Sequence, residues 1–456
     1  MHQEAGGPEA ADGAGQRGWE PVNEAARRLW IVRNPSDDLV ASGPVGWASQ
    51  QLRDALDARG IPTDLVEHLS DAPSDGMCVA VAGRTAPMTR ELVGAAGTTV
   101  PDAAEALGLI SGRLASRDVV LATGSDVRGL VYAVLELADV VACETDPLQA
   151  LRMQQTIVER PANPIRGVVR LFVSEVEDKP WFYDRESWHR YLSMLISHRF
   201  NRIQLALGMG VNFLRTITDA YFLFPYPFLV AVPGYNVRAL GLADEERERN
   251  LDTLRFVSDQ AAACGLHFEL GLWTHGYAWV DSPNATYLID GLTPENHAAY
   301  CRDAVCNLLE ACPGIAGLTF RVHGESGVPE GSYDFWKEVF RGAMECGRRV
   351  ELDLHPKGVD RQMIDVALQT GLLDSSRVSR SPSYCEFNRP LRASRFQSGC
   401  TTATSTRRSR IASPPWLAAM KLTPRQSPAT TRIPPIRCST SLSCGVGVPR
   451  PGSIRA

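Results

Sequence analysis

Strand-like and helix-like segments alternate five times between residues 166 and 376. Short runs of apolar and β-branched residues are each followed by a longer segment with helical periodicity. Repeated βα units predict a parallel sheet, either doubly wound or closed into a (β/α)8 barrel. The predicted strands are 167–173, 201–207, 267–273, 317–322 and 349–354, and the helices that follow them are 184–198, 244–264, 294–311 with Thr293 as its N-cap, 332–346 and 359–370.

Long loops with many aromatic residues follow the second and third predicted strands, and they favour the barrel. In such barrels the active site lies on the loops at the carboxyl ends of the strands. Because five units are fewer than eight, we expect an incomplete (β/α)8 TIM barrel over residues 160–376. Three missing strands would leave two open sheet edges and an uncovered interior.

A separate, small α/β domain is predicted over residues 28–150. In the stretch 124–141, Gly124 and Gly129 precede a predicted helix, but neither GxGxxG nor GxxxxGK is present. A packed crossover helix is therefore a better interpretation than a phosphate-binding loop. The other elements expected in this domain are strands at 29–33, 77–82 and 119–123, a helix at 46–59, and an apolar helix face made by Leu130, Val134, Leu137 and Val141.

The net charge of −5 combines two very different compositions. Residues 1–376 contain 33 Lys+Arg and 51 Asp+Glu, a net charge of −18, whereas residues 377–456 contain 14 and 1, a net charge of +13. The second segment is rich in Ser, Thr, Arg and Pro without periodicity, so we expect a disordered basic tail. A frame shift near Arg377 is the interpretation we favour, because the composition changes where a sixth strand should begin. Binding of nucleic acid through the tail is the less favoured alternative.

The ends of the chain and its cysteines indicate a cytoplasmic protein. Residues 1–27 are acidic and rich in Gly and Ala, without the apolar core of a signal peptide, and predict a disordered leader. The most apolar run, residues 220–232, is too short for a spanning helix and contains two prolines, so no membrane anchor is expected. The eleven cysteines form no CxxC pair and no zinc-like spacing, which favours reduced, mostly buried thiols.

The fourth predicted strand runs into TFRVHGESGVPEG, residues 319–331. Alternate residues of a strand share a face, so Arg321, His323 and Glu325 are expected to point toward the barrel axis. Glu325 is the last of them and should lie at the mouth, where a carboxylic acid suits proton donation to a leaving group. The alternative is that Glu325 pairs with Arg321 or Arg341 and only fixes the loop.

Two glycines and an opposite strand face complete the predictions for this segment. Gly324 and Gly327 flank the glutamate and allow unusual dihedrals or the close approach of a ligand. Leu318, Phe320 and Val322 occupy the other face of the strand and are expected to pack against helices.

The sequence WTHGYAW after the third strand offers aromatic candidates for substrate binding. Trp273 and His275 are followed by Tyr277 and Trp279, and aromatic faces at a barrel mouth commonly stack on sugar rings. The alternative is that these rings fill the top of the barrel core.

The fifth strand supplies further polar candidates. Glu351, Asp353 and His355 alternate with apolar residues and are expected to point inward. Buried ion pairing of the two carboxylates with Arg321 explains them equally well. A metal ion held by Asp353, His355 and Glu325 is conceivable, but ligands on different strands show no diagnostic spacing, and we predict no metal and no cofactor.

Three stretches of sequence resemble two families of glycoside hydrolases. They are DVRGLVYAVLELAD at the end of the small domain, ERPANPIRG before the first barrel strand, and RFNRIQLALG on the second. Their order resembles α-glucuronidases and β-N-acetylhexosaminidases, both of which place a non-catalytic α/β domain ahead of a (β/α)8 barrel. The resemblance covers residues 28–375 and implies a hexosaminidase domain 2-like fold for the first domain.

The glutamate after the fourth strand favours the α-glucuronidases. Hexosaminidases need an adjacent Asp-Glu pair there, and this chain has Gly324 before Glu325. In α-glucuronidases the strand ends in a run similar to NSEGQPGP, which HGESGVPEG resembles. The resemblance implies that Glu325 is the general acid of an inverting enzyme, with a base about 6.5–9.5 Å away on later strands that this chain lacks. Arg321 has the right chemistry for a uronate carboxylate.

Three functions stay open at the level of the sequence. The first is hydrolysis of polysaccharide-derived oligosaccharides, most like that of an α-glucuronidase, with a β-N-acetylhexosaminidase-like hydrolase as the alternative enzyme. Its binding candidates are Trp273, His275, Arg321, His323, Asp353 and His355. The second is a catalytically inactive carbohydrate-binding remnant, which the missing base favours. The third is binding of nucleic acid by the basic tail.

Overall fold

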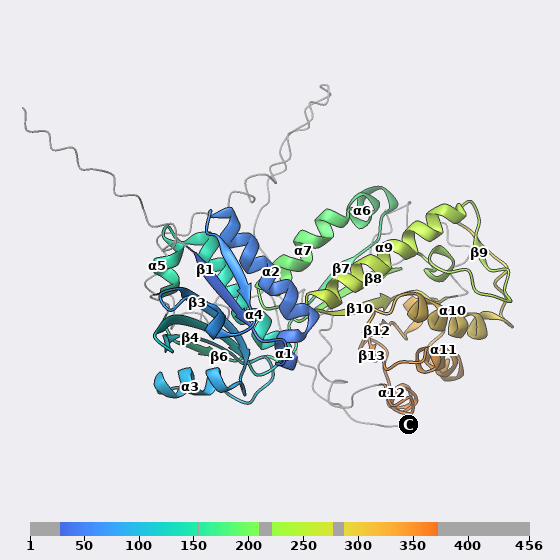
Figure 1. The fold of residues 1–456 in the computed structure, drawn as a ribbon. Coiled ribbons are helices and arrows are strands. Elements are labelled where there is room, and N and C mark those ends of the chain that lie inside the picture. The colour runs from blue at the N-terminus through green and yellow to red at the C-terminus, as the bar shows by residue number, and fades with distance from the viewer. Residues whose placement is uncertain (1–27, 153–154, 209–220, 277–286, 373–456) are drawn as a thin grey trace, which may run out of the picture. The chain divides into compact units, whose positions relative to one another are not determined.

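A computed structural model of the chain describes residues 28–152, 155–208, 221–276 and 287–372 (Figure 1). The predicted leader, the basic tail from residue 377, and the aromatic residues Tyr277 and Trp279 lie outside these residues. The predictions about them, including the frame shift and the binding of nucleic acid, stay predictions.

The N-terminal domain is built on a six-stranded sheet in the order β2-β1-β3-β5-β4-β6. The first three strands in the sheet and β5 pair in parallel, whereas β4 pairs antiparallel with both β5 and β6. The three predicted strands are confirmed. The sequence did not predict β2, β4 and β6, because β2 and β6 are short and half-exposed and β4 is interrupted by glycines. The strands are β1 (Leu29–Arg33), β2 (Thr63–Val66), β3 (Met77–Gly83), β4 (Leu107–Leu114), β5 (Arg117–Gly124) and β6 (Ile157–Glu159).

Helices cover both faces of this sheet. Neighbouring residues of β3 point to opposite faces of the sheet. Val79 packs into the core under α2 (Gly43–Ala58) and α4 (Val127–Cys143), whereas Cys78 packs under α3 (Pro87–Ala95). Figure 1 shows these helices on opposite sides of the sheet. A strand buried on both faces reads as a continuous apolar run, as β3 does. Two short helices complete the domain, α1 (Asp38–Ala41) and α5 (Pro147–Arg152).

The glycines before α4 are required by packing. A Cβ at Gly129 would lie 2.2 Å from the carbonyl oxygen of Ala106, and one at Gly124 would lie 2.1 Å from the backbone nitrogen of Leu130. Asp126 caps the helix by accepting a hydrogen bond from the Gly129 N–H at 2.8 Å. Protein backbone therefore fills the space that a phosphate would need, and the crossover-helix interpretation is confirmed.

The second sheet has five parallel strands in the order β13-β12-β10-β8-β7. A helix follows each strand, so the five predicted βα units are confirmed. One helix, α6, precedes α7 and was not predicted. The strands are β7 (Gly167–Leu171), β8 (Arg202–Leu207), β10 (His267–Leu272), β12 (Gly317–Phe320) and β13 (Glu351–Leu354), and the helices are α6 (Glu175–Phe182), α7 (Arg185–Ser197), α9 (Asp244–Ala263), α10 (His297–Ala311), α11 (Tyr333–Glu345) and α12 (Arg361–Leu368).

The hydrogen bonds of the predicted N-cap are present, although α10 begins at His297. Thr293 Oγ1 accepts from the Asn296 N–H at 3.4 Å, and the Thr293 carbonyl accepts from the His297 N–H at 3.0 Å. The helix begins after Asn296, and Thr293 lies three residues earlier. The Asn296 side chain closes this turn, because its oxygen accepts from the Thr293 N–H at 2.9 Å and its Nδ2 donates to the Gly291 carbonyl at 2.9 Å. Thr293 and Asn296 therefore cap each other's backbone N–H groups in the turn that leads into the helix.

The two faces of the five-stranded sheet differ in chemistry. Leu318, Phe320 and Val322 are buried in the core under the helices, as predicted. The opposite face is apolar at β7, where Val169 and Leu171 pack beside Ala206. Toward β13 it becomes charged. This alternation gives the sheet the polarity of a barrel wall, with helices outside and polar groups inside.

The loops at the carboxyl ends of β8 and β10 are joined by a small antiparallel ribbon. It consists of β9 (Arg238–Ala239) and β11 (Ile289–Asp290). These are the long loops that favoured a barrel, and the ribbon fixes them to each other at the end of the sheet where a barrel enzyme binds its substrate.

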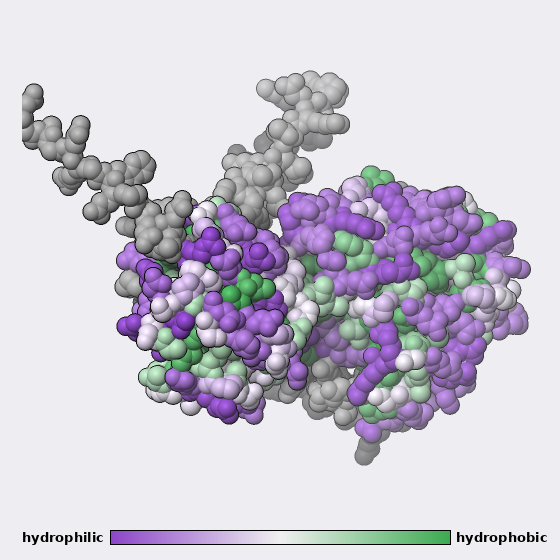
Figure 2. Space-filling model, viewed as in Figure 1, coloured by the Kyte–Doolittle hydropathy of each residue, from purple (hydrophilic) through white to green (hydrophobic). Residues whose placement is uncertain are grey.

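The visible surface carries no broad apolar band. Figure 2 shows apolar residues in small groups among hydrophilic ones on the face in view. Among the helices of the described residues, none has the length and apolar character needed to cross a membrane.

A buried carboxylate links the N-terminal domain to the five-stranded sheet. Glu105 is 5 % exposed and has a left-handed backbone with φ of 60°. Its carboxylate accepts hydrogen bonds from Arg166, from Asn201 Nδ2 at 2.8 Å and from Arg128 Nη1 at 3.4 Å. Arg166 and Asn201 directly precede β7 and β8, within two of the stretches that resemble glycoside hydrolases.

Replacing Glu105 by Ala is expected to destabilise the folded chain. The change leaves partly buried guanidinium and amide groups without their acceptor, which costs about 2 to 4 kcal/mol of unfolding free energy. Glu186→Ala is the control, because it removes an exposed pair with Arg190 and should cost less than about 0.5 kcal/mol. Urea unfolding of the full chain measures both values, and equal losses would contradict the role of Glu105.

Candidate active site

β12 ends in a short turn that carries the candidate glutamate. A 3-10 turn at Gly324–Ser326 follows the strand, and His323 lies at its N-cap position. His323 Nδ1 accepts a hydrogen bond from the Glu325 backbone N–H at 3.3 Å. The imidazole therefore fixes the direction in which the Glu325 side chain leaves the backbone.

The two glycines around Glu325 have different environments. Gly327 has φ of 80°, which confirms the predicted need for an unusual dihedral. A Cβ at Gly276 would lie 2.1 Å from the Cα of Gly327, so the loop after β10 packs directly on this turn. A Cβ at Gly324 would meet nothing within 4 Å, and that side of the turn is open.

Glu325 is held by two cations. Arg321 Nη2 donates to one carboxylate oxygen and Lys357 Nζ donates to the other. The Arg321 side chain is 1 % exposed, whereas those of Glu325 and Lys357 are 36 % and 58 % exposed. The site thus runs from a buried guanidinium to an accessible ammonium group.

The predicted alternative for Glu325 is also confirmed in part. Arg321 is its partner, as that alternative allowed, and Arg341 is not. Arg341 pairs with Glu338 at 2.9 Å and with Glu345 at 3.1 Å on α11.

The two cations keep Glu325 ionised. Burial alone would raise the pKa of Glu325, but the hydrogen bonds and charges of Lys357 and Arg321 outweigh it and lower the pKa to about 2. Burial and the charge of Arg321 lower the pKa of His323 to about 4. Burial and the neighbouring His323 lower the pKa of His355 to about 4. At neutral pH the two cations, the carboxylate and the two neutral imidazoles together carry one net positive charge.

Three buried polar atoms at the site have no hydrogen-bond partner among the described residues. They are Arg321 Nη1, Trp273 Nε1 and His355 Nδ1. Their groups are neighbours, since the Arg321 Cζ lies 5.4 Å from the Trp273 ring centroid and the Trp273 and His355 rings are 4.7 Å apart. Unsatisfied buried polar groups are costly, so this is a place where a polar ligand gains hydrogen bonds.

Trp273 lies inside the sheet rather than on the open mouth. It is 4 % exposed and packs with Ala206. A Cβ at Gly271 would lie 2.9 Å from its indole nitrogen, so the ring lies over that glycine. This position matches the alternative in which an aromatic ring fills the barrel core, while the guanidinium of Arg321 lies over the ring.

His275 lies away from the other candidates. It is fully buried, with ring centroids 5.0 Å from Trp336 and 5.4 Å from Phe320, on the helix-covered side of the sheet. Burial lowers the pKa of His275 to about 3, so the ring is neutral. The prediction that His275 binds substrate gains no support from this position.

A second charged cluster lies deeper on the same face. Arg202 donates to Glu269 and to both oxygens of Glu351, at 2.9 and 2.8 Å, and lies 3.8 Å from Asp353. The ion-pair partner of the two acids on β13 is therefore Arg202, and the prediction of Arg321 in that role is wrong. Arg202 reaches them from the inner face of β8, across β10 and β12, whereas Arg321 lies beyond the end of β12.

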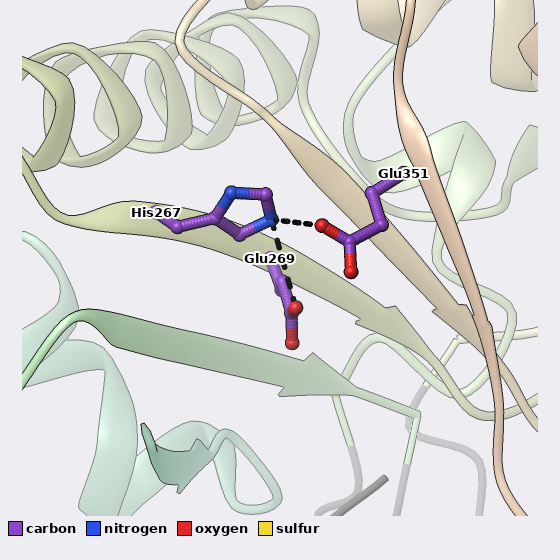
Figure 3. A group of neighbouring side chains, drawn as sticks. All are labelled: His267, Glu269 and Glu351. Atoms are coloured by element: carbon purple, nitrogen blue, oxygen red, sulfur yellow. Dashed lines mark ion pairs between the residues drawn. The ribbon is translucent and has the colours of Figure 1, made fainter. Parts of the chain in front are cut away.

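His267 completes this deep cluster (Figure 3). Its Nε2 lies 3.4 Å from Glu351 and 3.6 Å from Glu269. A Cβ at Gly317 would lie 3.0 Å from the same nitrogen, so the glycine on β12 leaves the room that the imidazole needs.

The spacing of a metal site occurs in the deep cluster, and not in the trio that the sequence made conceivable. Ligand atoms of His267, Glu269 and Glu351 lie within 4.8 Å of one another, and this is the group found among the described residues. Asp353, His355 and Glu325 do not form such a group there. Because the guanidinium of Arg202 already donates to both carboxylates, the cluster is better described as an ion-pair network than as a vacant cation site.

Burial changes the protonation of the deep carboxylates. Burial raises the pKa of Glu269 to about 7, although the charge of Arg202 opposes the change. Burial also raises the pKa of Asp353. Near neutral pH, the acids around Arg202 therefore retain a proton that they would lose in water.

The sequence analysis missed Lys357, Arg202 and Glu269. Lys357 follows the fifth strand by three residues, and the loop at the carboxyl end of a barrel strand is where a functional residue is expected. Arg202 and Glu269 alternate with buried apolar residues on their strands. The same two-residue period that selected Arg321 would have selected both of them.

The comparisons with known proteins identify a fold and no family. No protein-family model matches the sequence, and no curated protein matches it. Among solved structures, the chain is similar to a GH138 enzyme targeting pectin rhamnogalacturonan II. The TM-score is 0.56 at 17 % identity, with 76 % of this chain and 47 % of that chain covered.

Two further structures are similar at lower scores. The GH20 β-N-acetylhexosaminidase from Streptomyces coelicolor A3(2) has a TM-score of 0.45 at 15 % identity, covering 77 % of this chain and 70 % of that one. CpGH84D has a TM-score of 0.45 at 10 % identity, covering 76 % and 51 %. The chain spans about half the length of the GH138 enzyme and of CpGH84D. The expected glycoside hydrolase-like fold is confirmed, and the choice between families is not.

Raising the pH is expected to destabilise the folded chain through Glu269. The folded state keeps a proton on this group up to about pH 7, whereas the unfolded state loses it near its ordinary pKa of 4.5. Raising the pH from 5 to 8 therefore favours unfolding, by on the order of 1 to 3 kcal/mol. Glu269→Gln should have a flatter profile of unfolding free energy against pH.

Glu345→Gln is the control for this measurement, because it changes an exposed pair with Arg341. Its pH profile should run parallel to that of the natural chain. Parallel profiles for the natural chain and Glu269→Gln would contradict the raised pKa.

Proposed function

We propose that this chain is a glycoside hydrolase of uronate-bearing oligosaccharides, most like an α-glucuronidase, with Glu325 as its general acid. The observation that carries the proposal is the pairing of one carboxylate with both Arg321 and Lys357 at the carboxyl ends of the parallel strands. The fold supports a carbohydrate substrate, because the similar GH138 enzyme is a glycoside hydrolase that targets pectin rhamnogalacturonan II.

The charge of the site favours an acidic sugar over a neutral one. A carboxylate ligand would be attracted by the net positive charge and could accept from Arg321 Nη1, which has no partner among the described residues. A guanidinium binds a carboxylate in a two-pronged geometry, and a buried one does so with little competition from water. Lys357 is exposed enough to reach the same ligand.

In this proposal, Glu325 and its neighbours have different roles in binding and catalysis. The open side of the turn at Gly324 gives a glycosidic oxygen access to the Glu325 carboxyl group. His323 holds the backbone of Glu325, and the neutral His355 offers Nδ1 toward the ligand. Trp273 closes the floor of the site and excludes water. An inverting reaction also needs a base that activates water on the opposite face of the sugar.

A second candidate function is sugar binding without turnover. The other carboxylates on the inner face of the five described strands, Glu269, Glu351 and Asp353, all surround Arg202. A carboxylate in such a network is a poor base for water. This observation favours the inactive carbohydrate-binding remnant for the part of the chain that the structure describes.

Release of sugar from aryl or xylo-oligomeric glucuronides tests the proposal. The natural chain should release sugar, and Glu325→Gln should lower kcat by at least about 100-fold, because an amide cannot donate the proton. Asp334→Asn is the matched control at an exposed carboxylate in the first turn of α11, and its rate should be unchanged.

Each possible result has a distinct meaning. Equal rates for the natural chain and Glu325→Gln would remove Glu325 from the acid role. Binding of glucuronate without hydrolysis by the natural chain would support the second candidate and contradict the first.

A further inference from the structure

Lys357 is the one participant in the described site that is both charged and well exposed. It lies in the sequence HPKG after β13, and its ammonium group donates to Glu325 while most of its side chain faces solvent. The loop that carries it is fixed, because Gly358 has φ of 70° and a Cβ there would lie 2.5 Å from the Cβ of His323. A fixed loop with a long, exposed side chain can exchange one carboxylate partner for another without rearranging the fold.

We propose that Lys357 couples the binding of an acidic sugar to the protonation of Glu325. The carboxylate of the ligand takes over the ammonium group of Lys357 and the guanidinium of Arg321, and Glu325 then binds a proton from solvent. This inference rests on the proposed function, and it assigns to Lys357 a part in specificity that the sequence did not suggest.

The electrostatics of the site require such a step if Glu325 is to act as an acid. In the free protein, the two cations hold its pKa at about 2, so the carboxyl group has no proton to donate at ordinary pH. Burial acts in the opposite direction, and it becomes the dominant influence once a ligand carboxylate engages the cations. The negative charge of a nearby uronate raises the pKa of Glu325 further.

The other titratable groups around Glu325 carry no positive charge that could keep it ionised in place of the two cations. His323 and His355 face it from beyond the ends of β12 and β13, and both are neutral because burial lowers the pKa of each to about 4. Glu330, in the loop after the turn, is exposed. Within the described residues, the cations in contact with Glu325 are Arg321 and Lys357, and Arg321 is too buried to turn toward solvent.

A neutral sugar would leave this arrangement intact. It brings no carboxylate to compete for Lys357, so Glu325 stays ionised even when the sugar is bound. A uronate would then be preferred over a neutral sugar at two steps. It binds more tightly, and only its binding leads to the protonation of Glu325. The two steps together discriminate more strongly than charge attraction alone.

Titration calorimetry of the full chain with glucuronate tests the coupling. Binding is measured at pH 5 in buffers that differ in ionisation heat, so that the dependence of the observed heat on the buffer gives the number of protons taken up. The natural chain should take up a large fraction of one proton per glucuronate bound. Glu325→Gln should bind glucuronate with no uptake, and glucose should cause none with either protein.

Variants at two lysines complete the test. Lys357→Met should weaken glucuronate binding by about tenfold, the equivalent of one charge-assisted hydrogen bond, and should reduce the uptake. Lys337→Met is the matched control, because Lys337 is an exposed lysine on α11. It should change neither quantity.

Failure of the coupling is distinguishable from failure of the proposed function. Glucuronate binding without proton uptake, or uptake that persists in Glu325→Gln, would overturn the coupling and leave the acidic-sugar site in place. Absence of glucuronate binding to the natural chain would overturn both.

Discussion

Two buried guanidinium groups on the inner face of the parallel sheet constrain the rest of this structure. Arg202 and Arg321 each need carboxylate partners, because an unpaired buried charge would cost several kcal/mol. Arg202 obtains them from β10 and β13, which ties three strands together across the sheet. Arg321 obtains its partner from the turn that follows its own strand, which fixes the loop carrying Glu325.

The cluster around Arg202 has an excess of carboxylates, whereas the cluster around Glu325 has an excess of cations. Around Arg202, three carboxylates face one guanidinium, and protonation offsets part of the excess negative charge. Around Glu325, two cations face one carboxylate, and nearby donors lack partners among the described residues. In the deep cluster, the carboxylates are paired with Arg202 of the protein itself. In the proposed function, an anionic ligand completes the cluster around Glu325.

The sequence predicted the parallel sheet and much of this site, because both follow from alternation along strands. It placed Arg321, His323 and Glu325 on one face and found their neighbour His355. It could not predict that Trp273 and His275, two residues apart, lie on opposite faces of the sheet. Strand alternation would put both rings on the same face, but β10 ends at Leu272, and the close contact of Gly276 with Gly327 turns the chain. The alternation of side chains along a strand does not predict contacts between loops. Lys357, which lies in a loop, was not predicted for this reason.

A crystal structure of the full chain with bound glucuronate would show whether Arg321 and Lys357 bind an acidic sugar. We expect the sugar carboxylate to lie about 3 Å from Arg321 Nη1 and from Lys357 Nζ, with the ammonium group turned away from Glu325. The sugar bound elsewhere, or bound at the mouth with Lys357 still donating to Glu325, would contradict this expectation.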